Sequence, residues 1–144
     1  MATLRSVVNT AAQPGTGLTP VAGGDAGGKL TGYYDEYTVK AGDAQNDVVW
    51  LGPDLPLKKG DRFINFNLDW DAMGAGVTLA LGDDGSAARY MAATAANAAG
   101  QSVARANGIL GYKLTQDRNI QVTIAGGAPT VGAKFRLHWN VLRA

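Results

Sequence analysis

The alternation of apolar and polar residues over residues 61–83, DRFINFNLDWDAMGAGVTLALGD, is the feature that most constrains the fold. The first alternation carries one set of apolar residues: Ile64, Phe66, Leu68 and Trp70. After the sequence DAMGAG, a second alternation carries its own apolar set: Val77, Leu79 and Leu81. Because successive side chains of a strand point to opposite faces, the pattern predicts two half-buried strands joined by a short loop as a β-hairpin.

Similar patterns in the rest of the chain predict an all-β domain. Strands are expected at residues 29–40, 47–51, 87–91, 110–114, 120–124 and 131–141. Tyrosine and β-branched residues favour a strand at 29–40, and its lack of a clean apolar face predicts an edge or interface strand. The segment 47–51, DVVWL, is predicted to be a short buried strand. About eight antiparallel strands with turn residues between them predict a two-sheet β-sandwich.

Two local features lie between these strands. Asp83, Asp84 and Gly85 are standard turn residues and are expected to close the central hairpin at its far end. The alanine-rich stretch 92–106 predicts a short helix capped by Gly100. This expectation rests on the high helix propensity of alanine and on the preference for glycine just beyond a helix C-terminus.

Residues 1–28 differ from the rest of the chain, with frequent glycine and only Arg5 and Asp25 charged. Such a segment cannot bury enough apolar surface to offset its own ordering entropy. It is therefore interpreted either as a frayed tail or as a flexible N-terminal arm that orders on a neighbouring subunit. Extended at about 3.3 Å per residue, it would reach roughly 90 Å. Residues 29–144 are predicted to form the β-sandwich domain.

Composition excludes several classes of function. Thirteen basic and twelve acidic residues are interspersed, so the chain lacks the basic face that nucleic-acid binding usually needs. The chain has no cysteine, which excludes disulfides, thiolate zinc sites and cysteine nucleophiles. No apolar run approaches a membrane span of about 20 residues, and the N-terminus lacks the apolar core of a secretory signal. We expect no membrane partner and synthesis in the host cytoplasm.

Candidates for catalysis and for metal binding are weak. His138 is the only histidine, and no serine lies in a nucleophile-elbow context that would make it part of a catalytic set. The pairs Asp69/Asp71 and Asp83/Asp84 match no Ca²⁺ loop and are interpreted mainly as turn formers. The glycine-rich stretches match no phosphate-binding motif. We therefore expect no enzyme activity, no metal and no cofactor.

The aromatic residues suggest contacts with other molecules. The three tryptophans are assigned to apolar, core-like faces: Trp50, Trp70 and Trp139. Three tyrosines crowd the strand at 29–40, and exposed tyrosine clusters favour protein or sugar contacts. Packing of these tyrosines in the core or at a sheet edge is an equal alternative. The candidate protein contacts are Leu4, Val7 and Val8 in the N-terminal arm, with Tyr33, Tyr34 and Tyr37.

Several phrases of the sequence resemble the small capsid cement, or decoration, proteins of tailed bacteriophages. The resemblance covers roughly residues 30–144 and rests on GPDLPLKKGDRF, FNLDWDAMGAGVTLALGDDGSAARYMAA, GYKLTQDRNIQVTI and KFRLHWNVL. It implies a jelly-roll β-sandwich on the outer surface of the virion. It also implies a non-enzymatic role, with the major capsid protein as partner and with association of subunits into a homodimer or a trimer.

Two other functions stay open at this point. A carbohydrate-binding or receptor-binding sandwich of a phage virion would expose Tyr33, Tyr34 or Tyr37 as a platform, and jelly rolls also serve as lectins. A small hydrolase would need His138 beside a carboxylate in a cleft.

Overall fold

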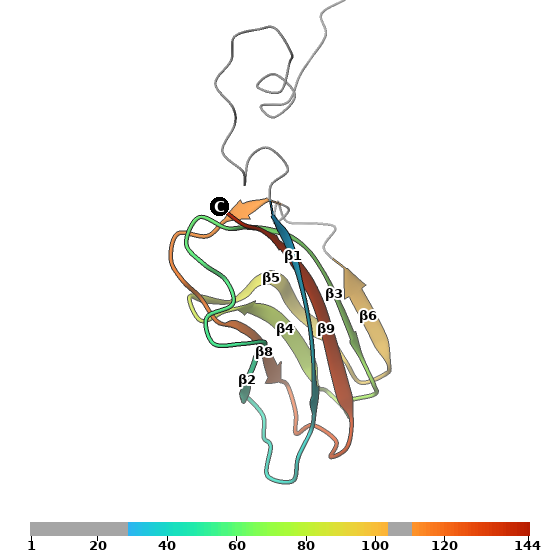
Figure 1. Cartoon of the computed structure of the whole chain (residues 1–144). Helices are drawn as coiled ribbons and strands as arrows, with labels where there is room; N and C mark the ends of the chain where they lie inside the picture. The colour runs from blue at the N-terminus through green and yellow to red at the C-terminus, as the bar shows by residue number, and fades with distance from the viewer. Residues whose placement is uncertain (1–28, 104–110) are drawn as a thin grey trace, which may run out of the picture.

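The computed structural model describes residues 29–103 and 111–144, which form nine strands in two antiparallel sheets (Figure 1). The first sheet, sheet A, has the strand order β1 (Leu30–Thr38), β9 (Lys134–Leu142), β3 (Arg62–Trp70) and β6 (Gly100–Val103), and β7 (Tyr112–Lys113) also pairs with β3. Sheet B has the order β2 (Val48–Leu51), β8 (Ile120–Ala125), β4 (Thr78–Asp83) and β5 (Ser86–Ala95). The prediction of an all-β sandwich is confirmed.

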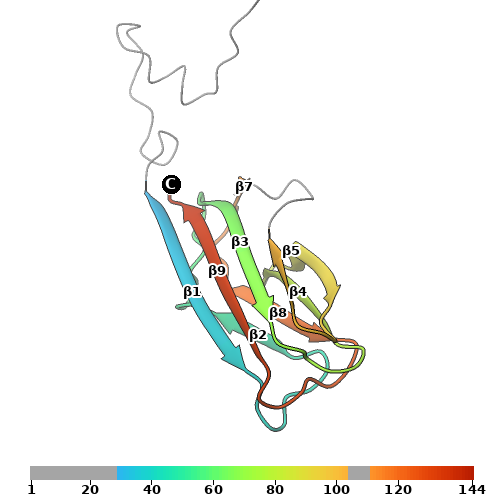
Figure 2. The same cartoon turned by 90° about the vertical axis from the view of Figure 1, so that its right-hand side faces the viewer.

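The strand order is that of a jelly roll. Four pairings are nested in the chain, namely β4 with β5, β3 with β6, β2 with β8 and β1 with β9. This nesting corresponds to one long antiparallel ribbon folded over itself. Two further pairings, β3 with β9 and β4 with β8, join the folded ribbon into two sheets. Two packed sheets with this order define the jelly-roll sandwich, and Figure 2 shows sheet A in front with β1, β9 and β3 side by side.

The predicted central hairpin is wrong, because its two strands belong to different sheets. β3 pairs with β6, β7 and β9, whereas β4 pairs with β5 and β8. The connection 71–77 crosses the sandwich and is held at both ends, since the Asp71 amide donates to the Lys134 carbonyl at 2.9 Å and the Ala96 amide donates to the Val77 carbonyl at 2.8 Å. Alternation shows which side chains are buried but not which strand pairs with which. The turn residues Asp84 and Gly85 instead join β4 to β5.

The predicted helix at 92–106 is also wrong. Residues 92–95 continue β5, residues 100–103 form β6, and residues 104–106 lie outside the described part of the chain. In β5, Thr94 pairs with Leu79 and Ala95 with Thr78, so backbone hydrogen bonding within sheet B outweighs the helix propensity of alanine. A helix of this length gains little stability without packing against the rest of the protein.

The phase of burial along β3 shifts at a bulge. The register with β9 changes between Phe63 and Asn65. Phe63 is therefore fully buried and stacks on Tyr90 with ring centroids 4.0 Å apart, while Ile64 is only half-buried. Beyond the bulge, Phe66, Leu68 and Trp70 are buried, as the alternation predicts.

Trp139 of β9 is the largest fully buried side chain among the described residues. Its ring is fully buried and stacks on Tyr33 of β1 at 5.0 Å between centroids. On another side the chain passes close to the ring at Gly52, where a Cβ atom would lie 2.8 Å from Trp139 Cη2. Gly52 also has a φ of +76°, a conformation that disfavours any side chain. Both constraints require glycine at this position.

Substitution of Gly52 tests this packing, and Gly42 provides a matched control. Gly42 has a φ of +97° with no atom within 4 Å of a built Cβ. Gly42→Ala should therefore lower the free energy of unfolding by about 1 kcal/mol, from backbone strain alone. Gly52→Ala adds a clash with Trp139, and overpacking of this kind lowers the free energy of unfolding by about 1–3 kcal/mol more. Urea denaturation of both variants measures the difference, and equal losses would contradict the described packing.

Candidate interaction surface

The two sheets differ in charge. The strands of sheet A carry a series of ionisable side chains besides tyrosine: Asp35, Glu36, Arg62, Asp69, Lys113, Lys134, Arg136 and His138. The strands of sheet B carry only Asp83 and Arg89. Asp83 is fully buried and bonds to Arg89, with 2.7 Å between Arg89 Nε and Asp83 Oδ2. The strands of sheet B therefore add no unpaired charge to the protein surface.

The part of the outer surface of sheet B that β2, β8 and β4 form carries no charged side chain from these strands except the buried Asp83, and we call it the neutral face. It consists of residues that alternate with the core residues of β2, β8 and β4: Val48, Trp50, Thr78, Ala80, Thr123 and Ala125. The strand register brings them into rows, with Thr123 opposite both Val48 and Ala80, and Ala125 opposite Thr78. Most are small and half-buried or buried, so the side chains lie close to the plane of the sheet.

Trp50 is the exception on the neutral face. It lies on the edge strand β2 and has 61% of its surface exposed, and its neighbour Val48 is 47% exposed. Val49 and Leu51, which alternate with them, pack in the core. A large exposed aromatic side chain beside small uncharged residues is unusual for a protein surface that contacts only water. The geometry therefore resembles the centre of a protein interface, where charge is depleted and aromatic residues are enriched.

The assignment of Trp50 to the core is wrong, as is the prediction that 47–51 is a buried strand. In VVWL both alternating sets are apolar, so the sequence pattern alone does not show which set faces inward. The register with β8 decides the outcome, because Val49 and Leu51 pair with the core residues Val122 and Ile120 and therefore share their face of the sheet. Trp70 and Trp139 are buried, as predicted.

The outer surface of sheet A is polar, and we call it the charged face. Glu36, Arg136 and Asp69 form one row across β1, β9 and β3, and Tyr34, His138 and Asn67 form the next. Arg136 Nη1 donates to Asp69 Oδ1 at 3.2 Å, and this hydrogen bond raises the pKa of Arg136.

Other polar groups on the charged face also bond to each other. The Tyr34 hydroxyl donates to Glu36 at 3.2 Å, and Asn140 Nδ2 donates to Asn65 at 2.6 Å. The pKa of the Tyr34 hydroxyl is raised by desolvation and by the nearby negative charge of Glu36.

The three candidate tyrosines do not share a surface. Tyr33 stacks on Trp139, and its hydroxyl accepts a hydrogen bond from Arg143. Tyr37 packs against Phe135 and donates to Asp43 at 2.7 Å. Only Tyr34 is largely exposed, at 63%. The other candidate contacts, Leu4, Val7 and Val8, lie outside the described residues.

The hydrogen bond between Tyr37 and Asp43 changes both ionisations. It is the largest cause that raises the pKa of Tyr37. The pKa of Asp43 is lowered, first by the backbone amide of Lys40 and then by the Tyr37 hydroxyl. The pair fixes the turn after β1, so its role is structural.

The carboxylate pairs lie beside arginines. Asp69 and Asp71 flank Arg136 at 3.2 and 3.5 Å, and Asp84 lies 3.7 Å from Arg118. Asp71 also accepts the Lys134 amide at 3.0 Å, in keeping with its predicted role in a turn. His138 is exposed between Tyr34 and Asn67 in the sheet. In residues 29–103 and 111–144, no three His, Asp or Glu residues gather in a way that would hold a metal ion.

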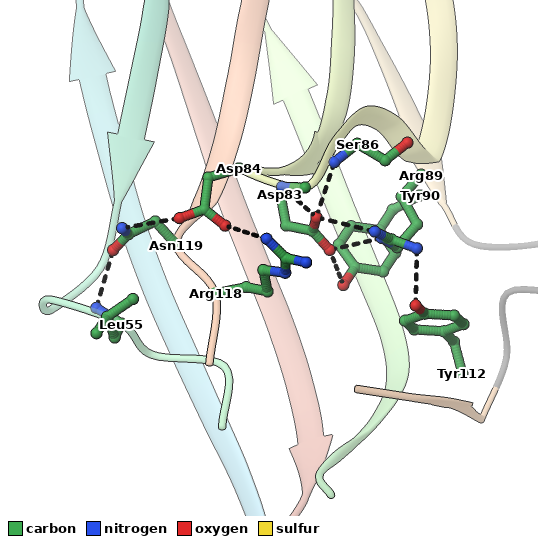
Figure 3. A network of polar contacts seen from close by, with 10 residues as sticks. Leu55, Asp83, Asp84, Ser86, Arg89, Tyr90, Tyr112, Arg118 and Asn119 are labelled. Carbon is green, nitrogen blue, oxygen red and sulfur yellow. Dashed lines mark hydrogen bonds and ion pairs between the residues drawn. The ribbon is translucent and has the colours of Figure 1, made fainter. Parts of the chain in front are cut away.

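Asp83 is the centre of a buried polar network at the β4–β5 turn (Figure 3). Its carboxylate accepts hydrogen bonds from the Gly85 and Ser86 amides at 2.9 and 3.0 Å, and from the Tyr90 hydroxyl at 2.9 Å. Arg89 bridges Asp83 to the hydroxyl of Tyr112, which lies 2.7 Å from its Nη1. The network thus ties the hairpin turn to β7 of the other sheet.

Burial and charge control the ionisation of this network. Burial raises the pKa of Tyr90 far above its ordinary value, and the charge of Asp83 raises it further. Burial acts to lower the pKa of Arg89, but the hydrogen bond and charge of Asp83 outweigh it, so that pKa is raised. Both shifts favour a neutral tyrosine and a charged arginine around one carboxylate, which suits a structural role.

Comparisons with solved structures place the fold. The chain matches one from the capsid of Ralstonia phage GP4 with a TM-score of 0.67 and 23% identity, over 90% of this chain and 93% of that one. It matches one from the capsid asymmetric unit of cyanophage Pam1 with a TM-score of 0.59 and 20% identity, over 81% and 84% of the two chains. A chain of the acidic stable capsid of Helicobacter pylori bacteriophage KHP30 gives 0.50 and 10%, over 79% and 87%.

These similarities show that the jelly-roll sandwich of this chain also occurs in chains of phage capsid structures. No family model matches the sequence, and no curated protein matches it either. Across residues 29–103 and 111–144, no helix has the length and apolar character needed to cross a membrane.

Replacement of Asp83 tests the network directly. Asp83→Ala leaves Arg89 and Tyr90 without their shared partner, and loss of one member of a buried ion pair costs about 3 kcal/mol or more. We expect this loss in the free energy of unfolding measured by urea denaturation. Asp117→Ala is the matched control, because Asp117 makes only exposed contacts: an ion pair of 3.9 Å with Lys58 and a hydrogen bond of 2.9 Å from the Lys59 amide, so its removal should cost about 1 kcal/mol or less. Equal effects of the two substitutions would contradict the structural role of the network.

The raised pKa of Tyr90 predicts a specific pH dependence. A group whose pKa is raised in the folded state stabilises the fold fully below its unfolded pKa, here 10.0, and loses that contribution as pH rises above it. The free energy of unfolding should therefore fall above about pH 10. In Tyr90→Phe the fall should be clearly smaller, whereas Tyr34→Phe, on the exposed surface, should keep most of it. An unchanged slope in Tyr90→Phe would show that Tyr90 does not cause the fall.

Proposed function

We propose that this protein is a non-enzymatic virion component that binds the outer surface of the major capsid protein lattice and stabilises the phage head. The observation that carries the proposal is the likeness to the chain from the capsid of Ralstonia phage GP4, which extends over nearly the whole of both chains. The order of sequence phrases that resembles capsid cement proteins supports the same role.

The physical properties of the sandwich suit such a component. A cement protein must keep its shape while it bridges neighbouring subunits. The Asp83 network joins the two sheets, and so does the close approach of Gly52, which follows β2 of sheet B, to Trp139 of sheet A. Its partner repeats many times on a lattice. Linked contacts on such a lattice raise the effective concentration of each binding site, so modest individual contacts give firm attachment.

The remaining parts of the proposal concern assembly. The partners are the major capsid protein and further copies of this chain, associated as a homodimer or a trimer. Residues 1–28 serve as an arm that contacts a neighbour through Leu4, Val7 and Val8.

Co-sedimentation tests the proposal. The purified full-length protein is mixed with empty particles assembled from the major capsid protein encoded in the same genome, and the particles are pelleted. We expect saturable binding and a higher temperature of particle disruption. If the protein stays in the supernatant at saturating concentration, the proposed function is wrong.

Deletion of residues 1–28 tests the role of the arm. If the arm clamps a neighbour, the deleted protein should bind the particles at least tenfold more weakly, because the contacts of Leu4, Val7 and Val8 are removed. A second variant carries Leu4→Ala, Val7→Ala and Val8→Ala in the full-length chain. It should show most of the same loss of binding, because it removes the apolar contacts but keeps the length of the arm. Unchanged binding of the deleted protein would show that the segment is a tail.

A further inference from the structure

We propose that the neutral face of sheet B, with Trp50 at its edge, is the surface that docks onto the capsid protein. This inference rests on the proposed function and adds to it the side of the sandwich that faces the shell and the chemistry that the partner must offer. It also leaves the charged face of sheet A in contact with solvent.

The difference in charge between the two sheets favours docking through sheet B. To bury the charged face, a partner would have to remove water from Glu36, Asp69, Arg136 and the exposed His138. Removal of charges from water costs more than their pairing returns unless the partner supplies matched groups. To bury the neutral face, a partner removes water only from uncharged side chains, namely the indole of Trp50 and small apolar or hydroxyl-bearing groups. The cost of docking is therefore lowest on sheet B.

Trp50 supplies a large projecting side chain, which the rest of the neutral face lacks. Tryptophan is enriched among the few residues that dominate binding energy, which lie in contacts shielded from water. Here the ring is 61% exposed beside Val48, while Ala80 is only 8% exposed and Thr123 is half-buried. The docking surface thus has one projecting aromatic side chain beside small residues that are half-buried or buried.

These features define the partner. A complementary surface has an apolar pocket for one indole ring and a flat, uncharged area beside it. We assign this surface to the major capsid protein, because the proposed function makes it the partner that repeats across the shell.

The neutral face is limited at one end by the fold. Gly82 of β4 lies in the row of Gln121 and Trp50, but a Cβ at Gly82 would lie 2.1 Å from the Ser86 carbonyl oxygen. The start of β5 therefore crosses over the sheet at this point. Among the residues that the structure describes, none crosses the remaining part of the face, which runs from Trp50 and Val48 across Thr123 and Ala80 to Thr78.

Two exposed aromatic residues on opposite faces allow a matched test. Trp50 and Tyr34 are 61% and 63% exposed, each on an edge strand, one on the neutral face and one on the charged face. Full-length Trp50→Ala and Tyr34→Ala are compared with the wild type by co-sedimentation with the empty particles. Thermal unfolding and circular dichroism check that both variants fold. We expect Trp50→Ala to weaken binding at least tenfold and Tyr34→Ala to change it less than twofold.

The outcomes separate the two proposals. If the wild type does not bind the particles, the proposed function fails and this inference fails with it. If the wild type binds and Trp50→Ala binds equally well, the function stands and the inference is wrong. A tenfold loss in Tyr34→Ala alone assigns docking to sheet A and also overturns it. Sedimentation of the protein without particles measures its oligomeric state and tests whether the neutral face joins copies of this chain. If Trp50→Ala dissociates an oligomer but keeps its binding to particles, the neutral face joins copies of this chain instead.

Discussion

The position of β9 between β1 and β3 is the constraint on which the rest of the structure depends. Its alternate residues Phe135, Leu137, Trp139 and Val141 are fully buried and fill the centre of the core. The same strand pairs along its whole length with β1 and with most of β3. Because β1 and β9 lie at the two ends of the described chain, their pairing within sheet A closes the folded ribbon.

Sequence patterns identified the buried positions well and the strand partners poorly. The alternation in β8 and β9, and in β3 beyond its bulge, predicted the buried apolar residues correctly, because period-two burial is a local property, whereas Ile64 before the bulge is only half-buried. The prediction of a hairpin at 61–83 was wrong because two consecutive strands show the same alternation of apolar and polar residues whether they pair with each other or lie in different sheets. The helix at 92–106 was wrong because pairing with β4 is a long-range effect that alanine propensity does not contain. Of the candidate contacts that the structure describes, Tyr34 is exposed, whereas Tyr33 and Tyr37 pack mainly against their own chain.

The surface that carries the functional inference was missed for a physical reason. β2 has apolar residues on both of its faces, and only its register with β8 turns Trp50 outward. The absence of free charge from the strands of sheet B is visible in the sequence, but it has meaning only once β2, β8, β4 and β5 are known to share one sheet. The pairing of strands thus converts scattered neutral residues into one face, and it separates that face from the charged residues of sheet A.

The central claim is that this jelly roll is a component of the virion that attaches through one sheet. A cryo-electron microscopy reconstruction of the virion tests it most directly. The account predicts density for the sandwich at repeated positions on the outside of the shell, with sheet B and Trp50 against the capsid protein and with sheet A toward solvent. Particles that lack this density, or particles in which sheet A faces the shell, would contradict it.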